Sequence, residues 1–253
     1  MTVTGERVTT LAGGFNPTFQ RHVAAYALCE RFLGDGRVLD LGCGVGHSFE
    51  LLSPRESVGV DVDSASLEGQ QRETVVADMR DLPFEDASFG SVVAVQSIEH
   101  VPDPERALRE MARVLEPGGV AVLVTPNRLT FGMPDEIVDP YHYVEFDPGE
   151  LRVACREHFA HVELYGLFGS PRYLELVGEE GRRLDALLRK DPLRARRIVP
   201  RRVRQRLYDW KLSRERSFAD PRAAAIEPSD FELRPEPLDD ALDLVAVCRS
   251  SPC

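Results

Sequence analysis

The stretch RVLDLGCGVGHS, residues 37–48, places three glycines at alternate positions directly behind an apolar run. The glycines are Gly42, Gly44 and Gly46, and the acidic Asp40 lies inside the apolar run. Glycine lets a backbone pass close to another group and adopt turns that other residues avoid. The stretch therefore predicts a buried strand that ends in a loop lying against a ligand.

The spacing of these glycines excludes the common phosphate-binding loops. The dinucleotide fingerprint G-x-G-x-x-G, counted from Gly42, would need a third glycine at position 47, where the chain has His47. A P-loop would need a Gly-Lys-Ser or Gly-Lys-Thr ending, which does not follow here. The loop is thus predicted to approach a ligand whose contact is not a nucleotide phosphate.

Strand-like apolar runs alternate with helix-like segments through the first half of the chain. Five runs are predicted to be strands: RVLDLG, SVGVDV, TVVAD, SVVAVQS and GVAVLVTP. A repeated β-α-β order with apolar strands indicates a parallel sheet covered by helices on both faces. Such sheets bind ligands at the carboxyl ends of their strands, and the glycine run occupies that place on the first strand.

The motif at residues 37–46 resembles motif I of the class I S-adenosylmethionine-dependent methyltransferases, whose consensus reads roughly VLDLGCGxG. The resemblance continues through VGVDVDS (58–64) and through the block 75–127, so it covers about residues 36–128. It points to the methyltransferase type 11 group. It implies an α/β fold with a seven-stranded, mostly parallel Rossmann-like sheet, helices on both faces and a helical insertion before the last strand.

The same resemblance implies S-adenosyl-L-methionine as cofactor and S-adenosyl-L-homocysteine as product. Asp61, at the end of the second strand, would hold the ribose hydroxyls, and Asp78 would face the adenine amino group. Gln96 would lie near the methionine moiety. The full set of cofactor-binding residues expected in the core is Asp40, Gly42, Gly44, Gly46, Asp61, Val62, Asp78, Met79 and Gln96.

The N-terminal segment 1–35 resembles an arm found in methyltransferases of sugar and natural-product pathways. By that resemblance Tyr26 and Arg21 reach the carboxylate end of the cofactor, which suits the pairing of guanidinium with carboxylate. A structural role is equally open. In that case Arg21 and His22 are surface groups of an amphipathic helix, and Tyr26 belongs to the core.

The element PYHYVEF, residues 140–146, recurs by resemblance in relatives that act on glycans and similar metabolites. His142 is the first candidate for a general base or an acceptor-orienting residue, with Glu145 as its partner. An imidazole titrates near neutrality and can take the proton that an attacking hydroxyl or ammonium loses. His100 is a second catalytic candidate, and packing of a loop is the alternative role for His142.

The core is predicted to comprise residues 36–170 and 241–253, and the interval 171–240 is predicted to be a basic helical insertion. Residues 181–216 contain 14 Lys and Arg against four acidic residues, a net charge of about +10. The insertion either covers apolar surface with its arginine stems or forms a lid that attracts an anionic acceptor.

The most specific function expected is methyl transfer to an oxygen or amino nitrogen of a sugar or amino sugar, as part of a natural product or its nucleotide-linked precursor. A quinone, phenol or lipid-like acceptor is the alternative within the same class. A protein that binds the cofactor without turnover, serving as a scaffold, is the alternative from another class.

Composition limits the partners. The net charge is −11, and the chain outside residues 181–216 carries about −21, which disfavours nucleic acid. The five cysteines are scattered and show no metal-ligand spacing, so we expect a reducing cytoplasm and no metal. No apolar run reaches the length of a membrane span. We therefore expect a small-molecule acceptor, no nucleic acid and no membrane, and a homodimer is a further expectation.

Overall fold

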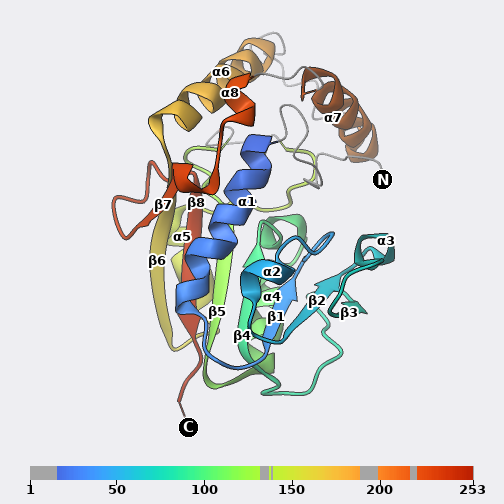
Figure 1. Cartoon of the computed structure of the whole chain (residues 1–253), viewed down its shortest axis with the longest axis vertical. Helices are drawn as coiled ribbons and strands as arrows, with labels where there is room; N and C mark the ends of the chain where they lie inside the picture. The colour runs from blue at the N-terminus through green and yellow to red at the C-terminus, as the bar shows by residue number, and fades with distance from the viewer. Residues whose placement is uncertain (1–15, 132–136, 138, 189–198, 217–220, 253) are drawn as a thin grey trace.

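The computed structural model describes residues 16–131, 137, 139–188, 199–216 and 221–252. The strands are β1 (Val38–Leu41), β2 (Ser57–Asp61), β3 (Glu73–Val76), β4 (Phe89–Val95), β5 (Leu115–Pro126), β6 (His161–Gly169), β7 (Phe231–Arg234) and β8 (Asp243–Arg249). They form one sheet in the order β3-β2-β1-β4-β5-β8-β6-β7 (Figure 1). Strands β1 to β5 pair in parallel, whereas β8 pairs antiparallel with both β5 and β6.

The helices follow the expected β-α-β order. The α-helices are α1 (Asn16–Cys29), α2 (Phe49–Leu52), α3 (Ser64–Leu67), α4 (Pro104–Val114), α5 (Pro148–Arg156), α6 (Pro171–Leu188), α7 (Arg201–Arg216) and α8 (Pro221–Ala224). Short 3-10 helices are η2 (Glu30–Phe32), η3 (Ile98–His100) and η5 (Pro228–Asp230). None of the helices in the described part of the chain is both long and apolar enough to cross a membrane.

Two buried apolar layers lie on the two faces of the sheet, as the parallel order predicts. One layer joins Leu39 of β1 to Leu108 of α4 and Leu151 of α5. The other joins Val38 of β1 to Ala24 of α1 and includes residues of α2, α6 and α8. Neighbouring residues of β1 enter opposite layers because side chains alternate along a strand.

The prediction of seven strands was wrong, because the described residues form a sheet of eight. The additional strand β7 pairs antiparallel with the outer edge of β6 and arises within the interval 171–240, which is therefore not only helical. Phe231 at its start is 5% exposed and packs against the ring of Tyr173, with centroids 4.7 Å apart. An unpaired edge strand exposes backbone donors and acceptors, and β7 covers part of the edge of β6.

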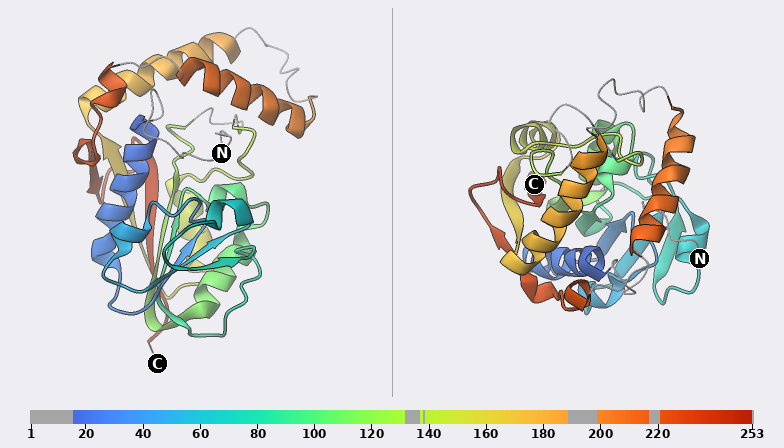
Figure 2. Two further views of the ribbon diagram at one scale, coloured as in Figure 1. Left: turned by 45° about the vertical axis from the view of Figure 1, so that its right-hand side comes forward. Right: turned by 90° about the horizontal axis from the view of Figure 1, so that it is seen from above.

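The insertion lies at the end of the molecule where the parallel strands finish. Figure 2 shows α6 and α7 above the loop that joins β5 to α5. Side chains of α7 contact this loop: Arg201 Nε donates to Pro140 O at 2.7 Å, and its guanidinium stacks 3.5 Å from the ring centroid of Tyr143. The insertion is thus attached to the segment that carries His142.

Candidate active site

A cavity of about 360 Å³ lies at the carboxyl ends of β1, β2 and β4. It is lined by many of the residues that the sequence indicated: Tyr26, Gly42, Gly44, Asp61, Val62, Asp78, Met79, Gln96 and His100. The other candidates, Arg21, Asp40, Gly46, His142 and Glu145, are not among the lining residues. The cavity occupies the position at which parallel α/β sheets bind their ligands.

The glycine loop follows β1 and forms one wall of the cavity. Gly42 has a φ of +71°, and a Cβ on it would lie 2.5 Å from the Cβ of Ser97, so only glycine fits there. Gly44 also has a positive φ, of +53°, but the space around its absent Cβ holds no atom within 4 Å. The first glycine therefore allows the loop to pack on the end of β4, and the second leaves room for a ligand.

Asp40 does not line the cavity but forms a hydrogen-bond network at the start of this loop. Its fully buried carboxylate accepts hydrogen bonds from Tyr26 Oη at 2.9 Å, from Ser48 Oγ at 2.6 Å and from Arg72 Nη2 at 2.8 Å. The charge of Arg72, whose side chain is 2% exposed, balances that of Asp40 inside the protein. This network joins α1 to β1, the strand that precedes the glycine loop.

Asp61 ends β2 with its carboxylate oriented by two backbone amides. Oδ2 accepts from Gly44 N at 3.0 Å, and Oδ1 accepts from Asp63 N at 2.9 Å. A carboxylate has further acceptor positions on each oxygen, so it can also receive two hydroxyl groups. Val62 beside it is 66% exposed and offers an apolar surface at the same rim.

Asp78 follows β3 and is paired with Arg80, which the sequence did not indicate. Arg80 Nη2 donates to Asp78 Oδ2 at 2.6 Å, and these hydrogen bonds hold the pKa of the Asp78 carboxyl below its ordinary value. Asp78 is therefore ionised and remains an acceptor at the cavity. Met79 next to it is 8% exposed and contributes an apolar wall.

Asp243, at the start of β8, connects two further candidates, although nothing in the sequence singled it out. Gln96 Nε2 donates to Asp243 Oδ1 at 2.7 Å, and Arg21 Nε donates to Asp243 Oδ2 at 2.6 Å. Arg21 is thus hydrogen-bonded to Asp243 and does not line the cavity. Its contact with a cofactor carboxylate stays a prediction. Gln96 lines the cavity and has a positive φ of +51°.

His47 is a lining residue that sequence reasoning missed. Neither of its buried ring nitrogens has a hydrogen-bond partner among the described residues. Burial lowers the pKa of His47 to about 4, so the ring is neutral at pH 7 and can donate one hydrogen bond. The only signal was its position, since it follows the last glycine of the loop directly. These free nitrogens, the open space above Gly44 and the Asp61 carboxylate fit a bound S-adenosylmethionine.

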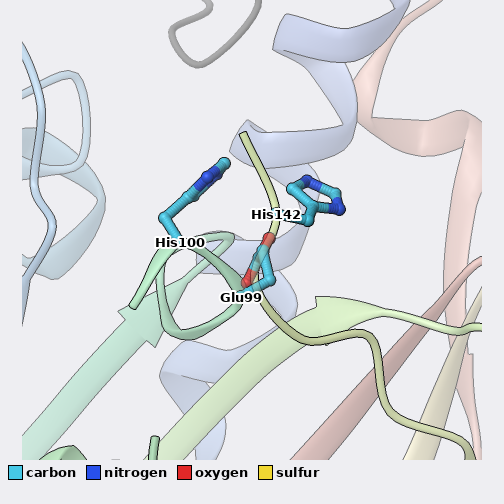
Figure 3. A group of neighbouring side chains, drawn as sticks. All are labelled: Glu99, His100 and His142. Atoms are coloured by element: carbon cyan, nitrogen blue, oxygen red, sulfur yellow. The ribbon is translucent and has the colours of Figure 1, made fainter. Parts of the chain in front are cut away.

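A second polar group adjoins the cavity beside His100. The rings of His100 and His142 lie with centroids 5.0 Å apart, and His142 Nδ1 is 2.8 Å from Glu145 Oε1. Figure 3 shows the carboxylate of Glu99, which no sequence motif indicated, next to His142. Glu99 is fully buried, and its Oε2 accepts from Thr125 Oγ1 at 3.1 Å. The structure thus gathers both histidine candidates and Glu145 around a buried glutamate.

Burial is the largest influence on the pKa values of Glu99, His100 and His142. It raises the pKa of Glu99 to about 7 and, with the nearby His142, lowers the pKa of His100 to about 4. Burial also disfavours the charged form of His142, but the hydrogen bond that its Nδ1 donates to Glu145 and the charge of Glu99 outweigh it, so the pKa of His142 is raised. His100 is consequently neutral at pH 7, whereas His142 is the ring that holds a proton more readily.

Two groups of described residues could hold a metal ion. One ligand atom each of Glu99, His100 and His142 lies within 4.8 Å of the others, and the same is true of Glu105, Glu157 and His158. The sequence-based expectation of no metal rested on spacing along the chain. It did not take account of the fold, which brings His142 next to His100.

Comparison with known proteins agrees with this geometry. A family model described as a methyltransferase domain matches residues 39–123. A probable S-adenosylmethionine-dependent methyltransferase of Mycolicibacterium smegmatis is 32% identical over 97% of this chain and 93% of its own length. Tocopherol O-methyltransferase of Arabidopsis thaliana is 31% identical over 42% of this chain and 34% of its own length.

The fold also has a solved counterpart. A methyltransferase of Thermotoga maritima, described as a possible histamine N-methyltransferase, aligns with a TM-score of 0.63 at 16% identity, covering 94% of this chain and 92% of its own. At this identity the likeness concerns the fold alone. The mycobacterial relative, however, matches nearly end to end. The chain therefore belongs to the S-adenosylmethionine-dependent methyltransferases.

Proposed function

We propose that the chain transfers a methyl group to an oxygen or amino nitrogen of a sugar or amino sugar, carried by a natural product or by its nucleotide-linked precursor. The observation that carries this proposal is the polar group of His100, His142 and Glu145 beside the cavity. A hydroxyl or ammonium acceptor must lose a proton, and this group offers imidazole and carboxylate for that purpose. The resemblance of the segment 140–146 to relatives acting on glycans supports the sugar assignment.

The cofactor supplies, when bound, a methyl group on a sulfonium sulfur, which leaves as a neutral thioether. The residues of the chain then have two tasks, to align the acceptor atom with the methyl carbon and to remove one proton. Asp61, Asp78 and the glycine loop orient the cofactor. His142, with Nδ1 held by Glu145, is the general base or the residue that orients the acceptor.

The segment 171–240 is proposed as a lid over the acceptor. Its helix α7 contacts the loop that carries His142 and Tyr143, and Tyr143 lines the cavity. The arginines of residues 181–216 would attract an acceptor that bears phosphate groups. Under the competing interpretation they cover apolar surface with their stems.

Two other functions remain candidates. A quinone, phenol or lipid-like acceptor is favoured by the similarity to tocopherol O-methyltransferase, which covers 42% of the chain. A cofactor-binding scaffold without turnover has the same cavity and would differ only in lacking a product. A small-molecule partner, a cytoplasmic location, no binding of nucleic acid or membrane, and a homodimer stay predictions.

The proposal is tested by mass spectrometry of acceptors incubated with the protein and S-adenosylmethionine. The panel contains amino sugars, neutral deoxysugars, their nucleotide-linked forms, glycosylated natural products, phenols and quinone precursors. We expect one added methyl on a sugar-bearing compound, with the product lost in His142→Gln and retained in the surface control His161→Gln. Methylation of a phenol or quinone alone would refute the sugar assignment, and no product from any acceptor would favour the scaffold.

A further inference from the structure

Two buried carboxylates near His142 have oxygens that their described neighbours leave without a hydrogen bond. Glu99 is fully buried and Glu145 is 3% exposed. Each keeps one carboxylate oxygen, Oε1 of Glu99 and Oε2 of Glu145, without a hydrogen-bond partner among the described residues. A buried carboxylate oxygen without a partner is unfavourable, and a cation next to it removes the penalty.

Both histidines present the nitrogen that a cation requires. His142 Nδ1 lies 2.8 Å from the acceptor Glu145 Oε1, and His100 Nδ1 lies 3.3 Å from the backbone carbonyl of Tyr141. Since a carbonyl can only accept, Nδ1 of His100 is the protonated nitrogen of its neutral ring, and the carboxylate selects the same tautomer for His142. In the neutral form of each ring, Nε2 is therefore the nitrogen that carries a lone pair. Metal-binding histidines are typically oriented in this way by a carboxylate or carbonyl behind them.

The positions of the donor atoms suit one small ion. One ligand atom from each of Glu99, His100 and His142 lies within 4.8 Å of the other two. Ligands bound at about 2.0–2.2 Å around a tetrahedral ion lie about 3.3–3.6 Å apart, so the side chains close by up to about 1.5 Å when the ion binds. We infer that Glu99, His100 and His142 (Figure 3) bind one divalent first-row metal ion, with Glu145 holding His142 in place.

The donor set selects the type of ion. Two imidazole nitrogens and one carboxylate suit Zn²⁺ or Mn²⁺, whereas Mg²⁺ prefers oxygen ligands alone. Three protein ligands leave coordination positions open for a substrate. This inference departs from the sequence-based expectation of no metal, because residues 99 and 100 meet residue 142 only in the folded chain.

The ion would act on the acceptor, and this step rests on the proposed function. An acceptor hydroxyl bound to the cation has a lowered pKa and loses its proton to solvent. The oxygen then forms its bond to the methyl carbon while the carbon–sulfur bond breaks, and the electron pair of that bond remains on sulfur. The net reaction converts hydroxyl and sulfonium into methyl ether, thioether and one proton. His142 is in this case the orienting residue rather than the base.

Metal binding is measured on the full-length protein after treatment with a chelator, by isothermal titration with ZnCl₂, MnCl₂ and MgCl₂ separately. We expect one Zn²⁺ or Mn²⁺ per chain and a markedly weaker response to Mg²⁺. Glu99→Gln and His142→Gln are expected to weaken binding by about 100-fold or more. The matched control is Glu105→Gln, which alters the other His–Glu group, where Glu105 Oε2 lies 2.9 Å from His158 Nε2; its affinity should not change.

Titration with S-adenosylhomocysteine on the same variants shows that they are folded and that the cofactor cavity is intact. Absence of Zn²⁺ and Mn²⁺ binding by the wild-type protein would overturn the inference, as would loss of binding in Glu105→Gln but not in Glu99→Gln. If Glu99→Gln does not fold, the metal affinity of His142→Gln alone tests the inference. Because these titrations need no acceptor, a metal site without sugar methylation would refute only the proposed function, and sugar methylation without a metal site would refute only this inference.

Discussion

The hydroxyl of Tyr26 donates a hydrogen bond of 2.9 Å to Oδ1 of Asp40, which ties helix α1 to the strand that precedes the glycine loop. Tyr26 also lines the cavity, so the same side chain is part of the core and of the ligand site. The two roles that the sequence left open for this tyrosine are therefore compatible. Contact between its ring and the cofactor remains a prediction.

Tyr26→Phe removes one hydrogen bond from a buried carboxylate that keeps two others. We expect a loss of about 1 to 2 kcal/mol in the free energy of unfolding, because hydrogen bonds to charged groups contribute about that much. Chemical denaturation measures it. Tyr165→Phe is the control, since the Tyr165 hydroxyl bonds to Glu163 at the surface and its loss should change stability by less than about 0.5 kcal/mol. Equal effects of the two substitutions would contradict the buried role.

Gly42→Ala and Gly44→Ala separate folding from ligand binding in the same loop. A Cβ at Gly42 would collide with Ser97, so this variant should lose stability by more than the roughly 1 kcal/mol set by a positive φ alone. A Cβ at Gly44 meets no protein atom, so this variant should lose only the stability set by its positive φ, and it should also weaken the binding of S-adenosylmethionine. Thermal unfolding and isothermal titration on both variants test this division. A Gly44→Ala protein with wild-type affinity would show that the ligand does not approach there.

Asp61→Asn tests the carboxylate assigned to the ribose. The amide cannot accept two hydroxyl donors as a carboxylate does, and we expect the affinity for S-adenosylmethionine to fall about 10- to 100-fold. Asp63→Asn is the control, because Asp63 caps α3 near the same strand end without lining the cavity. Isothermal titration of both variants gives the comparison. If the two substitutions weaken binding equally, the assignment of Asp61 is wrong.

Local motifs indicated several residues that line the cavity, because these residues lie at the end of a strand or within three positions after it. Asp61 ends β2, and Asp78 lies two residues beyond β3. A parallel sheet brings all carboxyl ends to one edge, so the strand pattern itself predicts that these residues meet. The class of fold and the edge of the sheet therefore follow from periodicity and glycine spacing.

Contacts between distant segments were not predictable in this way. Asp243 binds Gln96 across 147 positions of sequence, and no local pattern connects the two. Glu99 had no signal beyond its place next to His100, since burial decides its importance and burial depends on the packing of the 140–146 loop. The short strand β7 was missed because four residues carry too little periodicity to outweigh the basic, helix-like sequence before it.

Asp230 predicts how stability responds to acid. Hydrogen bonds from Arg172, aided by one from Ser170, lower the pKa of the Asp230 carboxyl to about 2. Since this value lies below the ordinary value of 3.8, ionised Asp230 stabilises the fold above pH 4, and the contribution disappears as the pH falls from about 4 to about 2. Asp230→Asn should thus be less stable than wild type at pH 7, with a smaller difference near pH 2.

Denaturation at both pH values measures that difference, with the exposed Asp239→Asn as control. The control should match the wild type throughout. A stability gap for Asp230→Asn that stays constant between pH 7 and pH 2 would mean that the Asp230 carboxyl is not the group losing its charge.

Arg201 links the lid to the acceptor side of the site. Its guanidinium stacks on Tyr143, and Nη2 donates to the carbonyl of Tyr141 at 2.8 Å. Arg201→Ala removes both contacts, so α7 should hold the loop of His142 less firmly. We expect the KM for the acceptor to rise about tenfold, which corresponds to a loss of roughly 1.4 kcal/mol in the free energy of acceptor binding. The affinity for S-adenosylmethionine should stay unchanged.

The control Arg202→Ala alters an exposed neighbour on the same helix and should leave both quantities at wild-type values. Because the helix and its charge are altered equally in the two variants, a rise in KM for both would point to general attraction of an anionic acceptor, and a rise for neither would show that α7 does not act as a lid.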